Sequence, residues 1–109
     1  MAEAIKVLGQ LSPAATTLST LYTVPALTST VISTITICNR AGAATTFRLS
    51  VAVAGAADAV QQYSFYDTPL DPNQTLAPTL GITLGAGDVV RCYSGNGSVS
   101  FNAFGSETS

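Results

Sequence analysis

The stretch TVISTITICN (residues 30–39), followed across a short loop by FRLSVAV (residues 47–53), decides the fold. In both runs apolar residues alternate with hydroxyl-bearing or other small residues, and β-branched residues dominate, as on a half-buried strand. Because side chains alternate sides along a strand, Val31, Ile35 and Ile37 are predicted to share one face, which a serine interrupts.

The second run is more regular than the first. Its alternation predicts a single apolar face made of Phe47, Leu49, Val51 and Val53. Only the short loop 40–45 separates the two runs. We therefore expect them to pair as the central hairpin of a β-sandwich.

Short apolar runs recur along the rest of the chain, with Gly and Pro turns between them. They span residues 17–24, 62–67, 75–79, 81–84, 89–94 and 98–104. This spacing predicts an all-β fold, an antiparallel β-sandwich of about eight short strands. Jelly-roll and immunoglobulin-like topologies both remain open. The sequence Gly95-Asn96-Gly97 predicts a hairpin turn between the last two strands.

The length of 109 residues predicts one domain. We assign residues 1–16 to an N-terminal arm or edge strand, residues 17–105 to the β-sandwich and residues 106–109 to a flexible tail. The apolar residues of the first segment do not fit one face of a simple strand; they are Ile5, Val7, Leu8 and Leu11. An edge strand and an arm lying on a neighbouring subunit both fit this spacing.

Charge is sparse in this chain. Charged residues make up 9% of the sequence and the net charge is −2, whereas about 25% charged residues is usual. The four basic residues are scattered, so we expect no nucleic-acid partner. No window is apolar enough to span a bilayer, so we expect no membrane association. Such a surface predicts self-association or burial against a large partner.

No catalytic, cofactor-binding or metal site is predicted, and we expect a protein that is not an enzyme. The chain has no His, which excludes a histidine base or imidazole ligand. Asp67 and Asp71 flank a proline and are interpreted as turn-forming residues, with a paired-carboxylate site as the alternative. Cys38 and Cys92 are expected to stay unbridged, because the start of the chain does not resemble a signal peptide.

The aromatic run near the middle of the chain leaves two interpretations open. Tyr63 and Phe65 are predicted to share one face, and Tyr66 the other, so that Tyr66 is the most exposed. Together with Tyr93, these residues either fill the core or stack on sugars or bases.

Several motifs resemble small virion structural proteins of tailed bacteriophages. The resemblance covers about residues 18–105 and is carried by LYTVP (21–25), STITICNR (33–40), TFRLSVA (46–52), YSFYD (63–67), LGAGDVVR (84–91) and VSFNAFG (99–105). It implies a β-sandwich that cements or decorates a capsid, or a small module of a tail or baseplate. It also implies a virion location after synthesis in the host cytoplasm.

The expected partners are the major capsid protein or other virion proteins, and further copies of the chain. The resemblance to decoration proteins implies a trimer. The predicted interface residues are Ile5, Val7, Leu8, Leu11 and Tyr66. The rival interpretation is a carbohydrate-binding sandwich that recognises the host surface, against which the absence of Trp counts.

Overall fold

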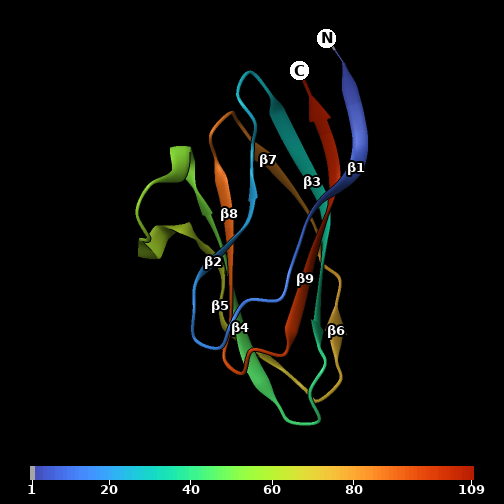
Figure 1. Ribbon diagram of the computed structural model, residues 1–109, viewed down its shortest axis with the longest axis vertical. Helices are drawn as coiled ribbons and strands as arrows, with labels where there is room; N and C mark the ends of the chain where they lie inside the picture. Colours follow the sequence, from blue (N-terminus) through green and yellow to red (C-terminus); the bar gives the residue numbers. More distant parts are fainter. Residues whose placement is uncertain (1) are drawn as a thin grey trace.

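The computed structural model describes residues 2–109, so Met1 of the predicted arm lies outside the described residues. Two antiparallel β-sheets pack face to face (Figure 1). The strands are β1 (Glu3–Leu11), β2 (Ser19–Thr23), β3 (Ser29–Asn39), β4 (Thr45–Ala52), β5 (Tyr63–Leu70), β6 (Thr75–Leu76), β7 (Thr79–Leu84), β8 (Val89–Ser94) and β9 (Val99–Thr108). Two short 3₁₀ turns, η1 (Val53–Gly55) and η2 (Val60–Gln62), lie between β4 and β5. The prediction of an antiparallel β-sandwich is confirmed.

The strand order is that of a jelly roll. Sheet A has the order β1-β9-β3-β6, with β7 also paired to β3, and sheet B has the order β2-β8-β4-β5. β6 and β7 lie along the same edge of β3 and act as one strand interrupted at Ala77 and Pro78. The strand pairs are then nested: the first strand pairs with the last, the second with the last but one, and so on to the middle of the chain. These pairs are β1·β9, β2·β8, β3·β6/β7 and β4·β5. Nested pairing describes one long hairpin folded over on itself, which selects the jelly-roll alternative.

The predicted central hairpin was wrong. β3 belongs to sheet A and β4 to sheet B, so the loop between them crosses the sandwich. The turn at Gly95-Asn96-Gly97 likewise joins β8 of sheet B to β9 of sheet A. Alternation reports which face of a strand is buried, but two strands alternate in the same way whether they pair side by side or face each other across the core.

A β-bulge in β3 changes which side chains face inward. The pairing of β3 with β9 goes from Ile32↔Gly105 to Thr34↔Phe104, so Ser33 is an extra residue relative to β9. Ile32 and Ile35 are consequently both buried, while Val31 is 43% exposed. The prediction that Val31 shares the buried face was therefore wrong, because one inserted residue reverses the alternation.

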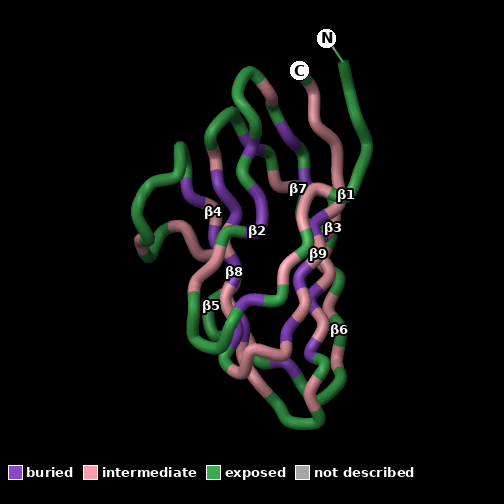
Figure 2. The backbone as a smooth tube through the Cα atoms, viewed as in Figure 1, coloured by how far each residue is buried: buried purple, intermediate pink, exposed green. Residues whose placement is uncertain are grey.

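The core lies between the two sheets (Figure 2). Phe47 and Leu49 are fully buried as predicted, and Val51 packs against the same core. Val53 is 71% exposed, because β4 ends at Ala52 and the chain turns outward in η1. The Phe47 ring meets Phe65 at a centroid distance of 5.3 Å.

The two termini lie side by side as paired strands, at one end of the molecule (Figure 1). β1 pairs with β9 from Glu3 to Leu11, which makes it an edge strand. β9 continues to Thr108, so the predicted tail at residues 106–109 is almost entirely strand. Its hydrogen-bonded partner is β1, and this pairing orders the C-terminal residues.

Candidate interaction surfaces

The outer face of sheet A is a regular array of uncharged side chains, half of them Ser or Thr. Residues in register across a sheet share a face, and the outward rows follow from the pairing. They contain Ile5, Ser106, Val31 and Thr83; then Val7, Phe104, Thr34 and Thr79; then Gln10, Asn102 and Thr36; and then Ser100, Cys38 and Thr75. We call this set the hydroxyl face, because Ser and Thr dominate it.

Charged side chains flank the hydroxyl face only at its ends. Glu3 is in register with Thr108 at one end. At the other end Arg40, which follows β3, donates to the Ser12 hydroxyl at 2.7 Å. Between these ends the apolar side chains stand well exposed, with Ile5 at 84% and Val7 at 49%. A surface of this kind is inexpensive to desolvate, because no ion has to leave water.

The four apolar residues predicted for an arm divide into two pairs. Pairing of β1 with β9 shifts between Val7 and Gly9, which makes Leu8 a bulged residue. Leu8 and Leu11 are half-buried and pack against the protein's own core, and their contact with a neighbour stays a prediction. Ile5 and Val7 lie on the hydroxyl face. The bulge explains why these residues fit no single face of a simple strand.

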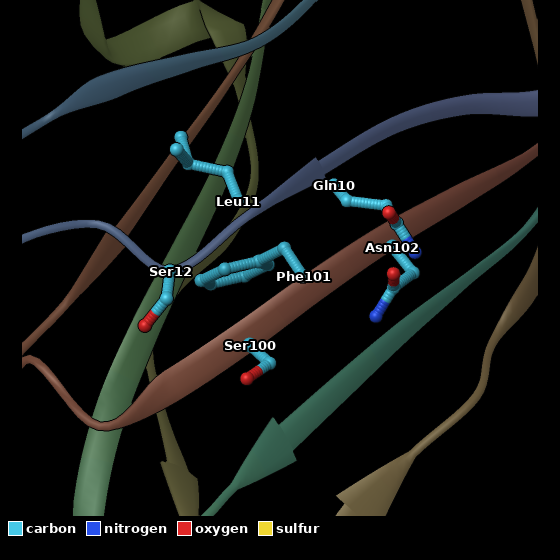
Figure 3. A pocket seen from close by; sticks show the side chains of 6 residues that line it. All are labelled: Gln10, Leu11, Ser12, Ser100, Phe101 and Asn102. Carbon is cyan, nitrogen blue, oxygen red and sulfur yellow. The ribbon is translucent and has the colours of Figure 1, made fainter.

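A hollow of about 360 Å³ opens beside the rows of the hydroxyl face that contain Asn102 and Ser100. Figure 3 shows the side chains that line it. Its lining residues are Gln10, Leu11, Ser12, Ser100, Phe101 and Asn102. The Gln10 and Asn102 amides lie next to each other, as expected of residues in register. Gln10, Ser100 and Asn102 also belong to the hydroxyl face. The hollow is therefore a depression in that face and not a separate site.

The outer face of sheet B has a different construction, because β5 is bulged twice. Leu49 of β4 is opposite Phe65, whereas Phe47 is opposite Thr68, so both Tyr66 and Asp67 stand against the single residue Arg48. Asp67 adopts a positive φ of 47°, which is uncommon outside Gly. Two outward side chains thus converge on one partner across the strand.

The second bulge lies at Ser64. Leu49 is opposite Phe65 and the next residue, Ser50, is opposite Tyr63, so Ser64 has no counterpart. Phe65 therefore packs on the core while Tyr63 lies with Tyr66, their ring centroids 5.0 Å apart at 86°. The prediction that Tyr63 and Phe65 share a face was wrong, since the inserted residue reverses the alternation.

Arg48 is held between two tyrosine rings. Its guanidinium carbon lies 4.2 Å from the centre of the Tyr66 ring and 4.3 Å from that of Tyr93. Tyr93 is its register partner on β8. Arg48 also donates from Nε to Oδ1 of Asp67 at 2.7 Å and from Nη2 to Oδ2 at 3.3 Å. We call Tyr63, Tyr66, Tyr93, Arg48 and Asp67 the tyrosine cluster.

A cavity of about 290 Å³ adjoins the tyrosine cluster and is lined by Val60, Tyr63 and Tyr66. Val60 stands 88% exposed in η2, and Tyr66 is 57% exposed. Burial and the neighbouring Asp58 carboxylate raise the pKa of the Tyr63 hydroxyl. Beneath the cluster, the buried Ser50 hydroxyl has no hydrogen-bond partner among the described residues. Of this group, sequence reasoning had placed only Tyr66 at an interface.

A third polar group links the two sheets near the termini. Lys6 Nζ lies 2.7 Å from Oε1 of Glu107, and Tyr22 of sheet B donates to the other carboxylate oxygen. The Tyr22 hydroxyl also lies 2.9 Å from that of Thr30. Hydrogen bonds from Lys6 and Tyr22 lower the pKa of Glu107, while burial and Glu107 raise the pKa of Tyr22 to about 12. This network supports the fold rather than a surface.

The remaining candidates for chemistry are separated. Asp67 lies inside β5 and is engaged with Arg48, so its interpretation as a turn-forming residue was wrong, because its positive φ belongs to a β-bulge. Asp71 comes just before a turn and its backbone N–H donates to Oε1 of Gln74, as expected of a turn-forming residue. Both cysteines are free: Cys38 on the hydroxyl face and Cys92 in the core, where burial raises the thiol pKa to about 12. Within residues 2–109, no group of His, Cys, Asp and Glu is arranged to hold a metal ion. The same residues contain no helix that is long and apolar enough to cross a membrane.

Fold and surfaces together define an antiparallel jelly-roll β-sandwich with one uncharged outer face and one tyrosine-lined outer face. No protein family, curated protein or solved structure matched the chain when compared with it.

Proposed function

We propose that this chain is a non-enzymatic structural subunit of a bacteriophage particle, one that cements or decorates the capsid by burying its hydroxyl face against virion proteins. The observation that carries the proposal is the near absence of charge from that face, together with its exposed Ile5, Val7 and Val31. The resemblance to virion proteins supplies the kind of partner.

The shape of the molecule suits this role. Its principal extents are 45, 27 and 19 Å, so a broad sheet face offers more than the roughly 800 Å² per partner of a standard interface. Burying Ile5 alone is worth roughly 1.5–3 kcal/mol. Many identical copies on a repeating lattice add avidity, so each contact need only be modest. The same physics serves a tail or baseplate module, which is the alternative location.

The proposal is tested by binding to particles of the virus that encodes the chain. Purified protein should co-sediment with particles, and electron microscopy of labelled protein should locate it on the capsid. A double variant, Ile5→Asp with Val31→Asp, should bind at least about 100-fold more weakly, because two carboxylates would be buried without partners. Val53→Asp is the matched control, since the exposed fraction of Val53, 71%, lies between those of Ile5 and Val31, and Val53 lies in η1, outside both faces.

Each outcome decides something. Wild-type affinity of the double variant would show that the hydroxyl face is not the docking surface. Labelling of the tail instead of the capsid would select the alternative module. A wild-type chain that is absent from particles and binds none of their proteins would end the virion proposal.

Light scattering tests the proposed trimer, which should have three times the 11.1 kDa chain mass.

A further inference from the structure

We propose that the tyrosine cluster and its adjoining cavity form a binding site for a neutral saccharide. This site is independent of the hydroxyl face, because it lies on the outer side of the opposite sheet. It adds a ligand-binding role to the structural role proposed above.

The construction of the site is the first argument. Both bulges of β5 fall at this cluster, and they place Tyr63, Tyr66 and Asp67 on the outer face together. Asp67 holds a positive φ there, a conformation that costs free energy in a residue other than Gly. Bulges and strained residues concentrate where a protein aims side chains at a ligand.

The cavity gives the shape of the ligand. Tyr63 and Tyr66 meet at 86° and form an aromatic corner that Val60 extends. The volume of about 290 Å³ lies at the lower end of small-ligand pockets, which suits a ligand of one or two sugar rings. The Arg48 guanidinium lies between the rings of Tyr66 and Tyr93. It fixes the position of the Tyr66 ring before any ligand binds. The apolar face of a sugar ring packs on such an aromatic surface.

The polar groups around the cavity give its chemistry. Asp58 lies beside the Tyr63 hydroxyl, and Asp67 pairs with Arg48. Two guanidinium groups lie on this face and both are engaged: Arg48 with Asp67, and Arg91, in register with Ser50, with the Gly55 carbonyl oxygen. Neither is free to pair with a phosphate or carboxylate group, and the nearby carboxylates repel such groups. Carboxylates and a phenol hydroxyl instead accept and donate the hydrogen bonds that sugar hydroxyl groups need. Neutral sugars are therefore favoured over nucleotides or acidic sugars.

The test uses the full chain, labelled with ¹⁵N, and a panel of methyl glycosides of neutral hexoses and N-acetylhexosamines. At least one should shift the amide signals of residues 60–67, with a Kd of about 1 mM, as expected for a small ligand. Glucose 6-phosphate, sialic acid and a nucleoside monophosphate should bind at least several-fold more weakly. No shift with any neutral sugar at about 10 mM, ten times the expected Kd, would overturn the proposal.

Variants separate this site from the docking surface. Tyr66→Ala should weaken sugar binding by about ten-fold, while Tyr66→Phe, which keeps the ring, should stay within a few-fold of wild type. The double variant of Ile5 and Val31 should bind sugar normally. If Tyr66→Ala leaves sugar affinity unchanged, or if Tyr66→Ala weakens particle binding and no sugar binds, the cluster is not a saccharide site. The first result leaves the hydroxyl-face proposal untouched, whereas the second would add the tyrosine cluster to the contact with the particle.

Discussion

The two outer faces of this sandwich are built in opposite ways. On sheet A the bulges of β3 and β1 lie at neighbouring levels beside β9, and each outward row continues from β9 to β3 without interruption. On sheet B two bulges fall close together in the edge strand β5, and they bring aromatic and charged side chains to a single place. The other edge strand, β2, has one bulge, at Leu21. One face is uniform and extended, and the other is local and chemically specific.

This difference shows how a jelly roll divides its surface. A face made mainly of Ser, Thr and uncharged apolar side chains suits a broad contact, in which no single residue dominates. A bulged edge strand concentrates Tyr and Arg, the residues that supply strong local contacts. The four predictions below test the construction of each face, in order of decreasing expected effect.

Gly105→Ala should give the largest loss of stability. A Cβ at Gly105 would meet the Val31 carbonyl oxygen at 2.0 Å and the Ile32 Cα at 2.9 Å, where the β3 bulge approaches β9. Because backbone rather than a flexible side chain blocks the space, unfolding free energy should fall by about 3 kcal/mol in urea titration. Gly42→Ala is the control, since nothing lies within 4 Å of that position. Equal stability of the two variants would mean that the strands are not so closely packed.

Arg48→Ala should cost less, about 1–2 kcal/mol of unfolding free energy. It removes a two-point ion pair to Asp67 and the contacts with two rings, all partly exposed to solvent. Arg48→Lys should recover only part of the lost stability, because the ammonium group of lysine is not planar and cannot stack on the tyrosine rings as a guanidinium does. Arg40→Ala, which loses one exposed hydrogen bond, should be nearly neutral. If both arginine variants behave alike, the tyrosine cluster is not preorganised.

The network of Lys6, Glu107 and Tyr22 should make stability depend on pH at both extremes. The pKa of Glu107 is lowered, so its contribution is complete above the ordinary value of 4.5 and is lost as pH falls through the lowered pKa. The pKa of Tyr22 is raised from 10.0 to about 12, so its contribution is lost as pH rises across that interval. Urea midpoints should therefore peak between these limits. Glu107→Gln should reduce the fall of the urea midpoint at acid pH, whereas substitution of the exposed Glu3 by Gln should leave that fall unchanged.

Thiol labelling of the two cysteines should distinguish the outer face of sheet A from the core, without any change in the stability of the protein. Cys38 lies half-buried on the hydroxyl face, while Cys92 is fully buried with its pKa raised to about 12 by burial. A thiol reagent should label one cysteine in the native protein and two in denaturant, as read by intact mass. Particle binding should slow labelling of Cys38. Unchanged labelling in the bound state would place the contact elsewhere.

Alternation and turn residues in the sequence alone determined the fold class. The runs around Ile35 and Phe47 predicted buried strand faces because burial on one side of a strand requires period two. The sparse charge likewise predicted a surface poor in ions, and Tyr66 was correctly expected to be exposed.

Only the tertiary structure decided the sheet in which each strand lies and where alternation reverses. A strand carries the same pattern whether its neighbour is beside it or across the core, so the sequence could not separate a β3–β4 hairpin from a crossover. A bulge depends on the partner's register, and Ser33, Leu8 and Ser64 have no local signature of one. The tyrosine cluster follows from that register, because Arg48 meets Tyr93 and Tyr66 only once β8, β4 and β5 are aligned.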